Sequence, residues 1–183
     1  MYKRQILDLL ENGKTVILDL GNAPPELMQY FSIHLSKAVF RQQVDKFSNN
    51  TLGEKYVQLY FEEAHNLFAP SDTDEKTSIY RRLAKEGAKY HIGMVYSTQS
   101  VSSVSKDLLG QTENFFIAHL ASQEEVGALA KVNIAYDSFR DDIMTTKTPG
   151  FIRMLTLHHR FVIPMQAKKF EAAAPISASA KAT

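Results

Sequence analysis

At residues 56–63 the sequence reads YVQLYFEE, an apolar run that ends in two adjacent carboxylates. The β-branched and aromatic residues of this run predict a strand. Because adjacent like charges repel, Glu62 and Glu63 need solvent, a cation or a hydrogen-bond donor nearby. The pair alone is as typical of a solvated strand end as of a site built around a cation.

Further apolar runs lie on both sides of this stretch, at residues 16–20, 92–96 and 115–120. Amphipathic stretches separate them, with helices expected from Pro24-Pro25 onward and over residues 75–89, 124–131 and 136–143. This alternation predicts an α/β fold with a mostly parallel sheet flanked by helices. Residues 151–157 and 160–166 alternate in polarity and predict a C-terminal β-hairpin. In parallel sheets of this kind the ligand lies beyond the carboxyl ends of the strands.

The expected boundaries follow from the same pattern. Residues 1–170 predict one domain, and the small polar residues 171–183 predict a disordered tail. Residues 45–55 and 69–74 are polar and predict a loop and a linker. The buried faces of the first two long helices are expected at Leu27, Met28, Phe31, Leu35, Ala38 and Val39, and at Ile79, Leu83 and Ala84.

Composition excludes several classes of protein. The 183 residues include no cysteine, which excludes disulfide scaffolds, thiol catalysis and thiolate metal sites. The net charge of +1 leaves no global attraction to polyanions. No apolar run approaches the roughly 18 residues that span a bilayer, and a reducing cytoplasm is the expected location.

Two strand ends carry residues suited to nucleotide hydrolysis. Glu62 and Glu63 fit a Walker B element, in which one carboxylate serves hydrated Mg²⁺ and the next polarises the attacking water. The following strand ends in Thr98-Gln99, where a neutral amide could sense a γ-phosphate. Thr-Gln after a strand is more often a simple turn, but its position one crossover after the acidic pair favours a shared site. A transition-metal site with Glu63 and His65 as ligands is a weaker alternative.

A phosphate-binding loop is not found in the chain. Gly13-Lys14-Thr15 resembles the end of the G-x-x-x-x-G-K-[ST] motif, but Asp8 stands where the first glycine is required. The segment also leads into a predicted strand, whereas a phosphate loop opens a helix. The basic tract at residues 81–89 is either the solvated face of a helix or a source of guanidinium for a neighbouring subunit.

The segments ILDLGNAPPE, LYFEEAHNLFAP and RRLAKEGAKYHIGMVYSTQS, in this order, resemble the HerA-like hexameric ATPases, which are RecA-fold DNA translocases and helicases related to FtsK and the conjugation ATPases. The resemblance covers about residues 17–166. It implies the C-terminal part of a RecA-like P-loop NTPase core, which binds ATP and Mg²⁺ between the subunits of a hexameric ring and DNA in the central channel. It also implies that the phosphate loop would lie upstream of Met1, and that a nuclease or other effector could accompany the motor.

Carried over by position, the resemblance makes Glu62 the Mg²⁺-side carboxylate through water, Glu63 the catalytic carboxylate and Gln99 the sensor. The family's E-G-R-K-Y-G block reads EGAKYH here, so Ala88 replaces the arginine and His91 the glycine. Arg82, or Arg81, is the candidate substitute for that arginine. The alternative function is a degenerate, non-catalytic module for ring assembly or partner binding. DNA contacts are unassigned, with residues 45–55 and 100–106 as candidate loops.

Overall fold

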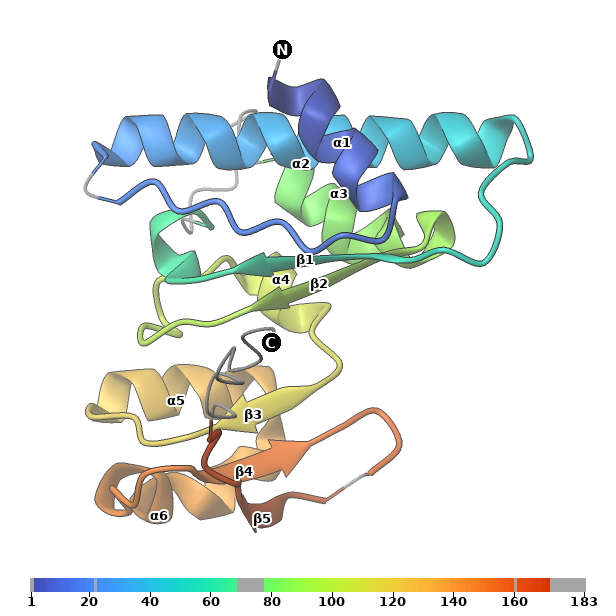
Figure 1. Ribbon diagram of the computed structural model, residues 1–183. Helices are drawn as coiled ribbons and strands as arrows, with labels where there is room; N and C mark the ends of the chain where they lie inside the picture. The colour runs from blue at the N-terminus through green and yellow to red at the C-terminus, as the bar shows by residue number, and fades with distance from the viewer. Residues whose placement is uncertain (1, 22, 69–77, 160, 172–183) are drawn as a thin grey trace, which may run out of the picture.

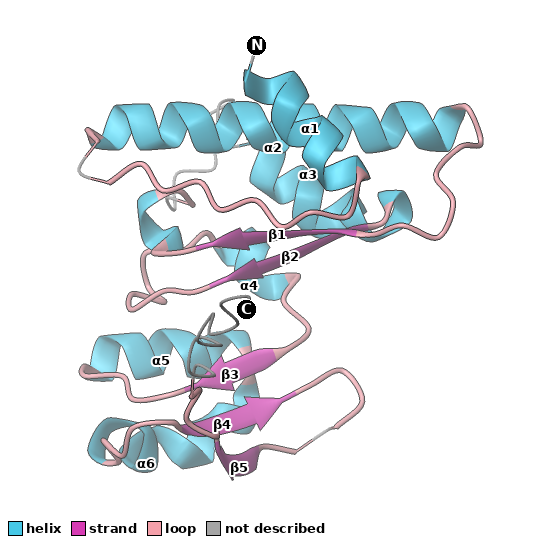
Figure 2. Cartoon of the chain, viewed as in Figure 1, coloured by secondary structure: helices cyan, strands magenta, loops and turns pink. Residues whose placement is uncertain are grey.

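The computed structural model describes residues 2–21, 23–68, 78–159 and 161–171 (Figure 1). Their α-helices, strands and 3₁₀-helices (η) are shown by type in Figure 2. In chain order the elements are α1 (Tyr2–Glu11), α2 (Pro25–Ser48), β1 (Val57–Phe61), η1 (Ala64–Asn66), α3 (Ser78–Glu86), η2 (Gly87–Tyr90), β2 (Ile92–Tyr96), α4 (Lys106–Gly110), β3 (Phe115–Ile117), α5 (Gln123–Val132), η3 (Ile134–Phe139), α6 (Arg140–Thr145), β4 (Phe151–Leu155) and β5 (Ile163–Gln166). The expected linker at 69–74 and all but the first residue of the expected tail lie outside the described residues.

The strands form two sheets rather than the one mostly parallel sheet that the sequence predicted. β1 and β2 pair in parallel, with Val57 opposite Ile92 and Phe61 opposite Tyr96. β3, β4 and β5 form an antiparallel sheet in that order. Figure 1 shows α1–α4 gathered around the first sheet and α5 and α6 beside the second, with β3 running in the same direction as β2. The mixed α/β class is therefore as expected, but β1–β2 is the only parallel pair within the described ranges.

The strand expected at residues 16–20 does not form. The segment carries no helix or strand, and the side chains of Ile17 and Leu18 are 87% and 46% exposed. An apolar run becomes a strand only when a neighbouring edge satisfies its backbone groups. In the described part of the chain no ladder joins this segment to either sheet, so its β-propensity alone does not decide its structure.

The helix that starts at Pro25 is longer and differently buried than expected. It continues to Ser48, so residues 45–48 are helical rather than part of a loop. Its most buried residues are Ile33, Ser36, Val39, Phe40 and Gln43, whereas Leu27 is 43% exposed. α2 crosses α1 and α3 (Figure 1), and its buried residues lie between Ile33 and Gln43, in the middle part of the helix.

An aromatic cluster fills the space between β1, β2 and α3. The ring of Phe68 packs against Phe61, Tyr80 and Tyr96, with centroid distances of 5.3, 4.5 and 5.6 Å. Ile79 and Leu83 of α3 are 3% exposed, which confirms their expected inward position. This core packs α3 against the sheet that β1 and β2 form.

The second part of the chain departs from the prediction mainly in helix type. Residues 134–139 form the 3₁₀-helix η3 before the short α6, in place of one helix over 136–143.

Arg153 of β4 is fully buried and joins β4 to α6 and to the residue that follows β3. Its guanidinium donates to Asp142 Oδ2 at 2.6 Å and to the carbonyls of Asp142 and Ala118 at 2.7 and 3.4 Å.

Gly87, at the junction of α3 and η2, is expected to be intolerant of a side chain. A Cβ atom at this position would lie 2.9 Å from the backbone oxygen of Ile92. Since backbone must shift to relieve that contact, Gly87→Ala is expected to lower the free energy of unfolding by about 1–3 kcal/mol. Gly127→Ala in α5 is the matched control: its nearest neighbour would be 3.7 Å away, and a gain of up to about 1 kcal/mol is expected. Urea denaturation of both variants checks the pair, and equal effects would contradict this explanation.

Candidate functional site

The carboxyl ends of β1 and β2 bring two polar segments together. The parallel register ends at Phe61 and Tyr96, and the backbone N–H of Ser97 donates to the carbonyl of Phe61 at 2.9 Å. The N–H of Ala64 donates in turn to the carbonyl of Ser97 at 2.8 Å. Backbone hydrogen bonds, and not only side-chain contacts, therefore keep residues 62–63 next to residues 97–99.

Glu63 and Gln99 meet directly at this edge. The Gln99 Nε2 group donates to Glu63 Oε1 at 2.9 Å, across 36 positions of sequence. Glu63 has a φ of 48°, a left-handed conformation that is uncommon for a residue with a side chain. The Glu63 side chain remains 47% exposed, so the pair is accessible to a ligand from solvent.

Glu62 lies beside this pair and has its own donor. The hydroxyl of Ser97 donates to Glu62 Oε2 at 2.8 Å, and the Glu62 residue is exposed. A single exposed carboxylate suits Mg²⁺, which keeps several waters and takes phosphate oxygens as further ligands. Ser97 was not singled out from the sequence, although its place directly after a strand is the signal that could have identified it.

His65 joins the same group of side chains. Its Nδ1 atom lies 3.1 Å from the Thr98 hydroxyl and 3.4 Å from Glu63 Oε2. Three side-chain contacts thus link the two strand ends: Glu62–Ser97, Glu63–Gln99 and His65–Thr98. In the part of the chain that the structure describes, no group of three or more histidine, aspartate or glutamate side chains could hold a metal ion, so the weaker transition-metal alternative gains no further ligand.

Arg82 is placed apart from these carboxylates. Its guanidinium lies over the ring of Phe40 in α2, 4.5 Å from the centroid, and pairs with Glu86 at 3.5 Å. Arg82 belongs to α3, the helix that leads the chain back to the amino end of β2, away from the carboxyl ends of the strands. The structure therefore does not bring Arg82 together with Glu63 and Gln99 within one chain.

The replaced family positions lie in and after η2. Ala88 is exposed and carries no charge where the resemblance implies an arginine. His91 has a φ of 56°, which explains why a glycine suits that position. The imidazole of His91 stacks on the ring of Tyr56, with ring centroids 4.2 Å apart.

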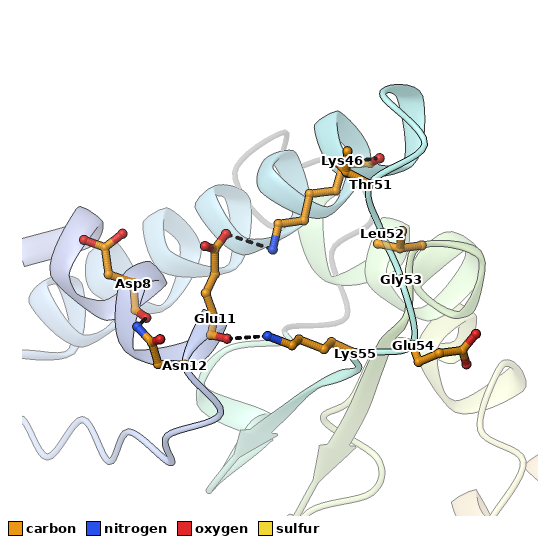
Figure 3. Close-up of a pocket in the computed structure, with 9 residues that line it drawn as sticks. All are labelled: Asp8, Glu11, Asn12, Lys46, Thr51, Leu52, Gly53, Glu54 and Lys55. Atoms are coloured by element: carbon orange, nitrogen blue, oxygen red, sulfur yellow. Dashed lines mark hydrogen bonds and ion pairs between the residues drawn. The ribbon is translucent and has the colours of Figure 1, made fainter.

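A hollow of about 590 Å³ lies at the opposite end of β1, where the chain enters the strand (Figure 3). Lys46 and Lys55 point into it, but both are engaged by Glu11. Lys46 Nζ lies 2.8 Å from Glu11 Oε1, and Lys55 Nζ donates to the Glu11 carbonyl at 3.0 Å. We therefore assign the candidate site to the carboxyl ends of β1 and β2, because this hollow offers lysines that an acidic residue already holds.

Sequence reasoning missed Glu125, which contacts the loop that follows Gln99. Its carboxylate accepts hydrogen bonds from Ser100 and Ser102, 25 and 23 positions earlier in the chain. Ser122 to Glu125 has the S-x-x-E form of a capping box, and the Ser122 hydroxyl does accept the N–H of Glu125 at 3.2 Å. That signal could have located the start of α5 but not the contact with a distant loop.

Within the described residues no helix is both long and apolar enough to cross a membrane. No family model matches the chain. Over 140 residues it is 19% identical to the DNA double-strand break repair helicase HerA of Sulfurisphaera tokodaii, which matches 76% of this chain but only 28% of that protein. The chain thus spans less than a third of the length of this relative.

Solved structures of one viral protein share the fold. The genome packaging NTPase B204 from Sulfolobus turreted icosahedral virus 2, in complex with ATP-gammaS, superimposes with a TM-score of 0.60 at 12% identity. The match covers 85% of this chain and 68% of that one. The complex of the same protein with sulfate gives a TM-score of 0.61, covering 86% and 68%. The chain is thus similar in sequence to a HerA helicase and shares its fold with a genome packaging NTPase.

Proposed function

We propose that this chain is the hydrolytic part of an ATP-driven DNA motor. In this role Glu62 would hold Mg²⁺ through a bound water, and Glu63 would polarise the water that attacks the γ-phosphate. Gln99 bonds to the γ-phosphate or to that water and changes partner when the phosphate leaves. Mg²⁺, when bound, would neutralise charge on the phosphate oxygens.

The hydrogen bond between Gln99 and Glu63 is the observation that carries the proposal. It joins the two residues to which the sequence pattern gave complementary roles, at the strand edge where ligands of α/β sheets bind. In the absence of nucleotide the amide satisfies the carboxylate. A bound γ-phosphate would compete for the same N–H, which would release Glu63 to bond water.

The phosphate-binding half of the pocket is proposed to come from polypeptide outside the printed sequence. The chain contains no G-x-x-x-x-G-K-[ST] motif. The strand order supports this. β2 is an edge strand of the first sheet and β3 is an edge strand of the second, and no strand of the described ranges pairs with the free edge of either. An inserted strand leading into a phosphate loop would pair with both edges and would place its loop beside Gln99.

The isolated chain is accordingly expected to bind ATP at least about 100-fold more weakly than the same chain supplied with a phosphate-loop segment. The isolated chain lacks the lysine and the backbone N–H donors of a phosphate loop. Each of these donors would make a charge-assisted hydrogen bond to the β- or γ-phosphate. Titration calorimetry of the chain with and without the polypeptide encoded immediately upstream measures this difference. Equal affinities in both samples would refute the shared pocket.

Hydrogen exchange on the same two samples provides the control. Backbone amides of β2 and β3 are expected to gain protection in the combined sample, because their open edges become paired. Amides of β1, whose ladder to β2 is already formed, should keep their protection. Protection confined to loops would contradict the inserted strand.

The remaining roles follow from the proposed assembly. In a homo-oligomeric ring, proposed here to be hexameric, Arg82 on the exposed face of α3 would reach the site of a neighbouring subunit, and the central channel would hold DNA. Arg82 is the better candidate for this role than residue 88, because Ala88 offers no guanidinium. The residues that bind DNA and those that bind a nuclease or other effector are unassigned.

A degenerate module that only assembles the ring is the second candidate. The uncharged Ala88 favours it, since stabilisation of the transition state in trans would then be missing. The retained contact between Glu63 and Gln99 opposes it, because an assembly module needs neither group at the strand end. ATP turnover by the assembled protein decides between the two.

A further inference from the structure

Two kinds of contact hold the loop that follows Gln99: its own apolar side chains are buried in the core, and a carboxylate of α5 accepts its hydrogen bonds. Val101 and Val104 are 6% and 2% exposed and anchor residues 100–105 in the core. Both oxygens of Glu125 are engaged by this loop. Oε1 accepts the hydroxyls of Ser100 and Ser102 at 3.0 and 2.8 Å, and Oε2 accepts the backbone N–H of Ser102 at 2.8 Å.

Glu125 is itself held in a fixed position. It belongs to the first turn of α5, and its backbone N–H donates to the hydroxyl of the N-cap residue Ser122 at 3.2 Å. In a capping box the glutamate side chain would turn back toward the N-cap N–H. Here the carboxylate bonds to Ser100 and Ser102 instead, so α5 is joined to the loop rather than to its own N-terminus.

Gln99 is consequently fixed from two sides. On one side Thr98 bonds to His65, next to the β1 end, at 3.1 Å. On the other side Ser100 bonds to Glu125 in α5. The position from which Gln99 reaches Glu63 is therefore set jointly by the end of β1 and by a helix that belongs to the second half of the chain.

We propose that Glu125 is a positioning residue for Gln99. It holds the loop at residues 100–103 so that the Gln99 amide reaches Glu63. The role of Gln99 as a γ-phosphate sensor rests on the proposed function. The positioning of Gln99 by Glu125, in contrast, is a property of the ligand-free chain.

The electrostatics agree with this role. Burial raises the pKa of Glu125, but the hydrogen bonds from Ser102, Ser100 and the backbone of Val101 together outweigh burial and hold the pKa below its ordinary value. Glu125 is therefore ionised under ordinary conditions. An ionised carboxylate that accepts several donors gives the stronger, charge-assisted kind of hydrogen bond.

The test compares Glu125→Gln with Glu124→Gln in the ligand-free chain. Glutamine keeps the shape of the side chain, but its NH₂ group cannot accept the donors that one carboxylate oxygen now takes. Glu124 lies in the same turn of α5 and is exposed, so its variant removes the same charge without touching the loop. Hydrogen exchange at the Ser102 amide and the NMR signal of the Gln99 side-chain amide are the two readouts.

Glu125→Gln is expected to speed exchange of the Ser102 amide at least about tenfold and to displace the Gln99 side-chain signal. Glu124→Gln should change neither. Faster exchange at Ser102 with an unmoved Gln99 signal would overturn the proposal, because Glu125 would then be only a loop anchor. No change at either position would overturn it as well.

Ser102→Ala keeps the test decisive if Glu125→Gln fails to fold. This variant removes one of the three donors and should produce the same two changes, with a smaller displacement of the Gln99 signal. Neither readout needs nucleotide. A turnover experiment that removed Glu63 from the mechanism would therefore sink the proposed function and leave the positioning result standing.

Discussion

Replacing Glu63 with glutamine is expected to lower the ATP turnover number of the assembled protein by about 10²–10⁴-fold while ATP affinity stays within about twofold. A glutamine side chain fits the same space beside Gln99 but cannot accept a proton from water. The nucleotide would still contact Glu62 and the phosphate loop, so binding should survive. Steady-state phosphate release and binding of a fluorescent ATP analogue measure the two effects separately.

Glu54→Gln is the matched control for this substitution. Glu54 is an exposed carboxylate at the opposite end of β1, where it lines the hollow shown in Figure 3. Its loss should leave both turnover and binding unchanged. Turnover of Glu63→Gln at the level of the Glu54→Gln control would remove Glu63 from the mechanism.

Replacing Arg153 with methionine is expected to lower the free energy of unfolding by about 3 kcal/mol. The methionine would fill part of the volume, but the carbonyls of Ala118 and Asp142 would lose a donor. The side chain of Asp142 is 46% exposed and can be rehydrated, so the unpaired carbonyls account for most of the loss. Urea denaturation monitored by circular dichroism gives the value.

Arg140→Met provides the comparison for an exposed arginine. Arg140 pairs with Asp137 at 2.7 Å, but both side chains are about half exposed, so a loss below about 1 kcal/mol is expected. If Arg153→Met cost no more than Arg140→Met, the buried arginine would not be the residue that joins β4 to α6.

The effect of Arg153 should also depend on pH. Its hydrogen bond, assisted by the Thr146 hydroxyl, lowers the pKa of Asp142 below the ordinary value of an aspartate. The stability that this pair contributes is present above the ordinary pKa and is lost as the pH falls through the lowered one. The difference in the free energy of unfolding between the wild type and Arg153→Met should therefore become smaller only in strongly acidic solution.

Local sequence pattern predicted the elements that carry the site. The run at 56–61 became β1, the run at 92–96 became β2 at its expected bounds, and Glu63 and Gln99 followed them. These segments are short, apolar and adjacent to each other in the sheet, so the register follows once one crossover helix is placed. The proximity of residues 62–63 to residues 97–99 was predictable from that register, whereas the hydrogen bond between the Glu63 and Gln99 side chains was not.

The errors arose where structure depends on a distant partner. Residues 16–20 have the composition of a strand, but among the described residues they form no ladder with either sheet. The contact of Glu125 with Ser100 and Ser102 joins positions more than 20 residues apart, and a carboxylate in a first helical turn looks like an ordinary cap. Arg153 is the one charged residue of β4 and has apolar residues on both sides, and nothing in this local pattern indicated that its guanidinium is buried.

A structure of the assembled protein with Mg²⁺ and a non-hydrolysable ATP analogue would show whether the carboxyl ends of β1 and β2 form the hydrolytic site. We expect the γ-phosphate within hydrogen-bond reach of Gln99, the metal on the Glu62 side and an ordered water between Glu63 and the phosphorus. Phosphates bound elsewhere, for example against Lys46 and Lys55 at the opposite end of β1, would contradict it.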